Sequence, residues 1–226
     1  YFQRQQGDKT KNLEQALAAF EQALTVRTRS ENAHAWANTQ TYLANAHVFR
    51  IRGVRADNIE TAIALYAAVL AIPLRTAYPK QWARTQHYLS AAYLERIRGE
   101  RAENIERAIA ACERALTVRT RSADPGEWAL TQTNLAQAYR LRIQGDQANN
   151  VETAISLYED TLTVYTRAFR PAKWAERQDR LASAYLVRIR GDRVDNIERA
   201  IAGSPQALQE NPREEFPIEW ANRLEN

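Results

Sequence analysis

Cysteine, methionine, glycine and proline are scarce or absent in this chain of 226 residues. A single cysteine excludes a disulfide framework and a cysteine-based zinc site. Seven glycines and seven prolines are too few for collagen, for a low-complexity linker, or for a sheet protein with many tight turns. The absence of methionine leads us to expect a fragment or a processed form of a longer protein.

Long hydrophobic runs and catalytic motifs are missing as well. No stretch approaches the ~18 apolar residues of a membrane span, and with no disulfides we expect a cytoplasmic protein. The sequence has no GxSxG motif, no glycine-rich phosphate loop and no HExxH spacing, and no acid repeats beside the three histidines. We therefore expect no enzymatic activity, no cofactor and no bound metal.

Lysine is rare, with four residues against 27 arginines. The 31 basic residues exceed the 27 acidic ones by only four, and both signs are interleaved along most of the chain. A nucleic-acid surface usually concentrates its basic excess on one face. Arginine instead favours forked hydrogen bonds to carboxylates and carbonyls, so the composition favours structural ion pairs.

What is present is a tandem repeat with a period of 46 residues and no insertion or deletion. Four residue types mark it in one register: Trp36, Trp82, Trp128, Trp174 and Trp220; Gly7, Gly53, Gly99, Gly145 and Gly191; Asn12, Asn58, Asn104, Asn150 and Asn196; Glu14, Glu60, Glu106, Glu152 and Glu198. Each period contains two amphipathic segments with helical spacing. We expect one helix to begin at the asparagine as its N-cap, with the glutamate in its first turn. The other carries the tryptophan and ends just before the glycine.

The pattern predicts an all-α fold of antiparallel helix pairs, about four to five 46-residue repeats stacked as a solenoid and forming a single domain over residues 1–226. Gly203, Ser204 and Pro205 predict a break in one helix, because proline removes a backbone donor. The predicted helices span about 12–28, 33–51, 58–74, 79–97, 104–120, 125–143, 150–167, 171–189, 196–210 with its break near 203–205, and 217–226.

The packing positions resemble the tetratricopeptide signature of large and small residues. The matching residues are Leu135, Ala136, Tyr139, Ala154 and Tyr158; Leu43, Ala44, His47, Ala62 and Tyr66; and Leu89, Ser90, Tyr93, Ala108 and Cys112. The family's usual repeat has 34 residues, so this chain resembles a lengthened form of the kind found in bacterial multidomain proteins. The resemblance implies a right-handed superhelix that binds peptides or proteins on its concave side, lined here by the tryptophan helices. The family's lysine for binding a C-terminal carboxylate is absent.

The main hypothesis is therefore a non-enzymatic scaffold for a protein or peptide ligand. We expect its groove to be lined by the variable outward positions of the tryptophan helices: Asn38, Thr41, Asn45, Arg84, His87, Gln137, Arg140, Glu176, Asp179 and Ser183. The alternative is a sensor or regulatory segment of a larger signalling or protease-like effector protein. RNA binding is less favoured, because no matched polar pair recurs at the same two groove positions.

Other recurring residues have structural interpretations. We expect Cys112 to be a buried, inert thiol and the tryptophans to belong to the core. The arginines at 50, 96, 142 and 188, and at 29, 75, 121 and 167, predict salt bridges to the recurrent glutamates and helix C-terminal caps, with an arginine stripe for an acidic peptide or RNA as the alternative. The glutamines at 40, 86, 132 and 178 predict a hydrogen-bond ladder that includes Thr39, Thr85 and Thr131.

The two ends match incomplete repeats. By register, residues 1–6 correspond to the tail of a tryptophan helix and residues 220–226 to the beginning of another. Ends without a polar capping helix expose apolar surface that a neighbouring repeat would cover. We therefore expect weak head-to-tail self-association through residues 1–30 and 200–226.

Overall fold

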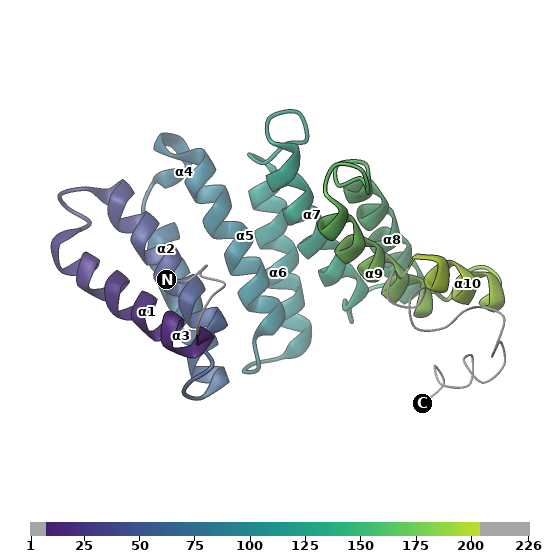
Figure 1. Cartoon of the computed structure of the whole chain (residues 1–226), viewed down its shortest axis with the longest axis horizontal. Coiled ribbons are helices and arrows are strands. Elements are labelled where there is room, and N and C mark those ends of the chain that lie inside the picture. Colours follow the sequence, from purple (N-terminus) through teal and green to yellow (C-terminus); the bar gives the residue numbers. More distant parts are fainter. Residues whose placement is uncertain (1–7, 204–226) are drawn as a thin grey trace. The chain divides into compact units, whose positions relative to one another are not determined.

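The computed structural model describes residues 8–203, and every regular element within that range is a helix (Figure 1). The all-α prediction is confirmed for these residues. They fall into two compact units, within residues 1–144 and 145–226, which we describe one at a time; the prediction of a single domain stays a prediction. The helices are α1 (Lys9–Val26), α2 (Ala33–Phe49), α3 (Arg55–Leu70), α4 (Leu74–Ala77), α5 (Pro79–Glu95), α6 (Arg101–Leu116), α7 (Pro125–Arg140), α8 (Gln147–Leu162), α9 (Pro171–Leu186) and α10 (Arg193–Gly203).

Helices that follow one another along the chain pack against each other, as expected for a helical-repeat array. In the first unit, α2 packs on α1 and α3, and α5 packs on α3 and α6. The tryptophan helices also touch directly, α2 with α5 and α5 with α7. In the second unit, α9 packs on both α8 and α10. The first unit therefore places α2, α5 and α7 side by side in one layer.

The predicted starts of the tryptophan helices at residues 33, 79, 125 and 171 are confirmed, the last three with proline at the first helical position. The short helix α4 was not predicted; it brings Leu74 into the core. Of the predicted break near 203–205 only Gly203, the last described residue of α10, can be placed, and residues 204–226 lie outside the described residues. The predicted helix 217–226 lies outside them, as do residues 1–7 and 204–226 of the predicted head-to-tail contact through residues 1–30 and 200–226.

The other helices begin three residues before the asparagine, so the N-cap prediction is wrong. Asn58, Asn104 and Asn196 are buried inside their helices. Each side-chain amide donates a 2.9 Å hydrogen bond to a backbone carbonyl six residues earlier, as Asn104 does to Arg98. The asparagine thus fastens the preceding connection to the helix, because a buried amide must find a partner.

The recurring glycine lies in that same connection, not directly at the end of a helix. α5 ends at Glu95, and Gly99 follows with a φ of +76°, the left-handed conformation that favours glycine. A Cβ atom at Gly99 would lie 3.8 Å from Oδ1 of Asn104. Backbone conformation, more than space, therefore explains the glycine here. The predicted C-terminal ends of the helices also lie two to five residues beyond the observed ends.

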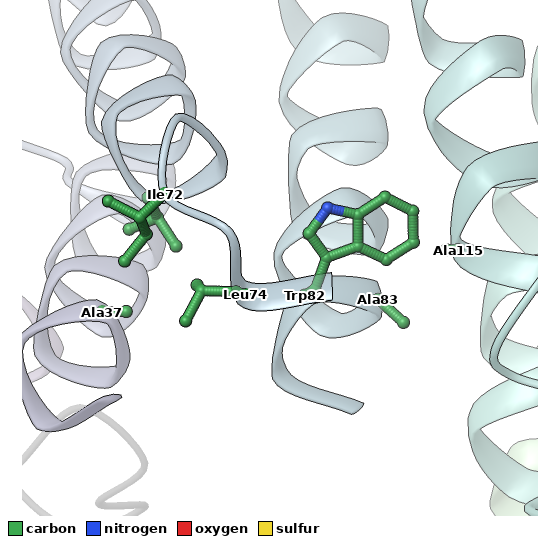
Figure 2. Packing of buried hydrophobic residues seen from close by; sticks show 7 residues of the cluster. Ala37, Ile72, Leu74, Trp82, Ala83 and Ala115 are labelled. Atoms are coloured by element: carbon green, nitrogen blue, oxygen red, sulfur yellow. The ribbon is translucent and has the colours of Figure 1, made fainter. Parts of the chain in front are cut away.

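The core lies between the two layers of helices. One cluster gathers Trp82 with Ile72, Leu74 and Ala115 (Figure 2), which confirms Trp82 as a core residue. Trp128 and Trp174 are only half-buried, and an arginine seven residues earlier covers each tryptophan ring. The guanidinium carbons of Arg75, Arg121 and Arg167 lie 4.9, 5.5 and 5.6 Å from the ring centroids of Trp82, Trp128 and Trp174. This series of arginines therefore stacks on tryptophans, where salt bridges were expected.

The other arginine series forms the predicted ladder of salt bridges. Each arginine just after a tryptophan helix holds the glutamate 36 residues earlier through two hydrogen bonds, which we call an arginine–glutamate fork. The donor–acceptor distances are 2.9 and 2.8 Å for Arg50–Glu14, 2.8 and 2.8 Å for Arg96–Glu60, 2.7 and 3.0 Å for Arg142–Glu106, and 2.8 and 2.9 Å for Arg188–Glu152. The glutamates lie in the second helical turn, so the fork and not the helix dipole explains them.

The forks predict that the fold loses stability in acid. Hydrogen bonds from the arginines hold the pKa values of Glu14, Glu60 and Glu152 below their usual range. A carboxylate with a lowered folded-state pKa contributes stability above its unfolded pKa of about 4.3, and that stability is lost as the pH falls through the folded pKa. Urea unfolding at pH 6, 4 and 3 should show a falling free energy of unfolding. Glu60→Gln should lessen the fall, and an equally steep profile in that variant would contradict the explanation.

Two further predictions concern buried polar side chains, namely Cys112 and the recurring glutamines. Cys112 is buried as predicted, and burial raises its pKa to about 12, which leaves an inert thiol. The predicted glutamine ladder is wrong: the side-chain oxygens of Gln40, Gln86 and Gln132 are buried and accept no hydrogen bond among the described residues. The hydroxyls of Thr41 and Thr85 lie 3.1 Å apart between α2 and α5 instead, and Thr41 donates to its own helix, to the carbonyl of Ala37 at 2.8 Å.

Candidate partner-binding face

The outward side chains of α2, α5 and α7 form what we call the tryptophan-helix face of the first unit. The 17 residues of α2 include no aspartate, glutamate, lysine or arginine. α5 contributes Lys80, Arg84 and Glu95, and α7 contributes Glu127 and Arg140. By contrast, α6 in the other layer carries six charged residues, from Arg101 to Arg114. The tryptophan-helix face is therefore mostly aromatic and amide in character.

Arg84 joins α5 to α2 at the centre of this face. Its Nη1 donates to the Tyr42 hydroxyl at 3.2 Å, its guanidinium carbon lies 5.2 Å from the centre of the Tyr42 ring, and its Nη2 donates to Asn38. Asn38 in turn lies 3.1 Å from Nε2 of His34, whose ring packs 4.2 Å from that of Tyr78. The predicted residues Asn38 and Arg84 are thus brought together, and tyrosine and histidine side chains surround them.

A second cluster joins α5 to α7. Nδ1 of His87 lies 3.3 Å from the Thr131 hydroxyl and 3.4 Å from the side-chain nitrogen of Asn134. Asn134 also donates to the Ser90 hydroxyl at 3.2 Å. The His87 ring packs 5.3 Å from that of Tyr88. The predicted residue His87 therefore belongs to a network of amide, hydroxyl and aromatic groups along the junction of two tryptophan helices.

Tyr88 and Arg119 link the two clusters through electrostatic interactions. Burial raises the pKa of Tyr88, which also feels the charges of Arg84, Arg119 and Glu127. Burial lowers the pKa of Arg119, which forms an ion pair with Glu127 and donates to the Thr131 hydroxyl at 3.0 Å. Glu127 thus neutralises Arg119, while the contacts of Arg84 within residues 8–203 are to the neutral side chains of Tyr42 and Asn38.

Two predicted residues do not face outward. Thr41 is fully buried and lies 3.1 Å from the Thr85 hydroxyl. Asn45 is also buried, and its side-chain oxygen accepts a 3.3 Å hydrogen bond from Tyr66. Both join helices inside the fold, so the expectation that they line a groove is corrected. Gln137 and Arg140 are half-exposed near the end of α7, away from Glu127 in its first turn.

The remaining predicted residues lie on α9 of the second unit. Glu176 is half-exposed and forms ion pairs with Lys173, Arg177 and Arg180 at 3.1, 2.8 and 3.5 Å. The exposed Ser183 donates to the backbone carbonyl of Asp179 at 2.9 Å. This helix is rich in charge, in contrast to α2. Glu176, Asp179 and Ser183 belong to the second unit and not to the tryptophan-helix face of the first.

Arg177 takes part in a different form of the contact between an arginine of the connection and a threonine of the tryptophan helix. In two earlier repeats an arginine of the connection donates to a helix threonine, as Arg27 does to Thr39 and Arg119 does to Thr131. The residues 46 positions later are Tyr165 and Arg177, so the guanidinium now comes from the helix. Arg177 is 1% exposed and stacks 5.2 Å from the centre of the Tyr165 ring. Because this cation is enclosed by its own unit's Tyr165 and Glu176, we interpret it as structural.

Sequence reasoning missed Tyr42, Tyr88 and Asn134 on the tryptophan-helix face. All three occupy one register position, 46 residues apart. Tyr42 and Tyr88 each lie one residue from a position that was chosen, Thr41 and His87, and Asn134 lies three residues from Gln137. The sequence did contain a signal for these residues. Side chains that touch across neighbouring tryptophan helices lie 42 to 47 residues apart in the sequence, as Tyr42 and Arg84 do.

Among residues 8–203 there is no cluster of histidine, cysteine, aspartate or glutamate that could hold a metal ion. Nor does any helix in that range have the length and apolar character needed to cross a membrane. No protein-family model matches the chain. A comparison with curated protein sequences also gives no match. The tetratricopeptide resemblance therefore rests on the packing residues and on the sequential pairing of helices.

Proposed function

We propose that the chain is a non-enzymatic scaffold that binds a protein or peptide across the tryptophan-helix face, within a tetratricopeptide-like right-handed superhelix. One contrast supports this proposal. The forks, the glycines and the buried asparagines repeat almost unchanged. The tryptophan-helix face differs from repeat to repeat, with Asn38, Arg84 and Leu130 at one register position, which Glu176 occupies on α9 of the second unit. A specific ligand without a repeat of its own requires such a varied surface.

The chemistry of the face suits an extended peptide. Asn38 and Asn134 are amides, which can donate to and accept from a peptide backbone. Tyr42 and Tyr88 offer rigid aromatic area with a polar tip, a combination enriched in binding surfaces. Arg84 has no carboxylate partner among its contacts, so we expect it to lie opposite a carboxylate or carbonyl oxygen of the ligand.

The charge pattern disfavours RNA for the same face. α2 has no arginine or lysine, and Arg119 is already paired with Glu127. Nucleic-acid binding depends on several arginines or lysines that neutralise phosphates. The four forks also occupy the most regular arginine series. We therefore expect no mobility shift of single-stranded RNA at low salt.

The experiment is selection of displayed random peptides on the immobilised chain, followed by anisotropy titration of an enriched peptide. Arg84→Ala and His87→Ala should each weaken binding at least about ten-fold, equivalent to about 1.4 kcal/mol. Arg107→Ala is the matched control, because Arg107 is exposed on α6 and pairs with Glu103 of the same helix. Failure to enrich any peptide, or equal binding by the Arg84 variant, would count against this face.

A further inference from the structure

An isoleucine occurs at the same place in each repeat and is exposed every time. Ile51, Ile97, Ile143 and Ile189 lie 46 residues apart, in the connection that follows each tryptophan helix. Their exposed fractions are 65, 63, 62 and 63%. Single exposed apolar residues are ordinary, but the same large side chain exposed at every turn of a repeat is a pattern.

Three of these residues lie along one edge of the first unit. Ion pairs from Arg98 to Asp57 and from Arg55 to Glu95 tie the first two connections together. The third connection is held to the beginning of α6 by the fork between Arg142 and Glu106, and α6 itself follows the second connection. We call Ile51, Ile97 and Ile143 the isoleucine row. Phe49 and Val54, both exposed, extend its apolar surface beside Ile51.

The fold itself gives no reason for the isoleucines. The connection is held by the fork, by the left-handed glycine and by the buried asparagine, as shown by Arg96, Gly99 and Asn104. None of these contacts involves the isoleucine side chain. A polar residue would serve the connection as well and would avoid placing apolar area in water. The row therefore suggests a partner outside the single chain.

The charges around the row indicate what kind of partner fits. The arginine before each isoleucine is neutralised by its fork, and Arg98 after Ile97 is paired with Asp57. Arg52 after Ile51 forms no ion pair among the described residues. An anionic membrane or nucleic acid would need several unpaired cations, and a single one is present here. An apolar strip whose rim is mostly satisfied ion pairs resembles instead the core and rim of a protein interface.

We propose that the isoleucine row is a self-association surface on which a second copy of this chain binds, row against row, about a two-fold axis. The spacing of the isoleucines is the reason for choosing a second copy as the partner. Isoleucines that recur once per stacked helix pair require apolar groups with the same spacing on the partner. The isoleucine row of a second copy supplies groups with that spacing. A two-fold contact of one surface with itself closes at the dimer. Because the strip is narrower than a standard interface, the dimer should be weak and concentration-dependent.

The test is sedimentation velocity over a wide concentration series. The wild type should shift from monomer to dimer, and Ile51→Ser, Ile97→Ser, Ile143→Ser in one chain should weaken dimerisation at least ten-fold while leaving the helical spectrum unchanged. The single variant Ile97→Ser should fall between them. Val26→Ser with Phe169→Ser is the control. Val26 is the last residue of α1 and Phe169 lies in the connection between α8 and α9, so both exposed side chains lie where the chain leads into a tryptophan helix and not where it leaves one.

Any of four results would overturn the proposal: a wild type that stays monomeric at high micromolar concentration, an unchanged dimer in the triple variant, equal loss in the control, or growth beyond the dimer. The last would indicate head-to-tail contact through the ends, which propagates instead of closing. The readout needs no peptide ligand, so its failure is separate from any failure of the proposed function.

Discussion

Replacing Leu89 with alanine should lower the free energy of unfolding by about 2–5 kcal/mol. Leu89 is 6% exposed and packs with Tyr66, Ile59 and Ala62 in the core between α3 and α5. Truncation removes apolar contacts and leaves a cavity that the surrounding helices fill only in part, so both losses add. Urea denaturation followed by circular dichroism measures the change.

Val26→Ala provides the matched control for this core substitution. Val26 is also an aliphatic helix residue but is 72% exposed, so its truncation should change stability by less than about 0.5 kcal/mol. A cost for Leu89→Ala below about 1 kcal/mol would mean that the stripe of apolar residues on α5 is not the core of the array.

Asn104→Ala should destabilise the fold by about 1–3 kcal/mol although it removes no apolar contact. The side-chain amide of Asn104 donates to the carbonyl of Arg98 at 2.9 Å, and its oxygen accepts from Arg96 at 3.2 Å. Its removal takes a partner from each of these groups at a site that is almost fully enclosed. Thermal unfolding of the variant would measure the loss.

The exposed residue Asn149 offers the comparison for Asn104. Its side chain accepts a 2.7 Å hydrogen bond from Arg190 at the surface, where water can replace it, so Asn149→Ala should cost less than about 0.5 kcal/mol. Equal losses in the two variants would show that the buried amide does not fasten the connection. A larger loss at Asn104 would support the same role for Asn58 and Asn196.

The number and order of the main helices could be predicted because the 46-residue period separates apolar stripes cleanly. Their starts could not, because asparagine suits two places equally well: an N-cap and a buried bridge to a carbonyl. The actual N-cap positions hold Asp8, Val54, Glu100 and Asp146, so no residue type is common to all four. With no common capping residue, the asparagine was the only regular mark near the start of the helix.

The candidate face was predicted in part, for a related reason. Arg84, Asn38 and His87 were found because charged and polar side chains on a tryptophan helix usually point to water. Thr41 was misplaced because threonine can satisfy its hydroxyl on its own helix and then be buried at little cost. A buried threonine and an exposed one look alike in a sequence. They can be distinguished only when the position of the neighbouring helix is known.

The sequential pairing of helices has a consequence for how the chain acquires its structure. The helix contacts described within each unit join the same or adjacent repeats, so few long loops must close before favourable packing begins. Chains rich in such local contacts fold quickly, and repeat arrays can nucleate at any repeat. During synthesis, a 46-residue segment within a unit is then able to pack onto its predecessor as it leaves the ribosome, without waiting for the far end of the protein to be made.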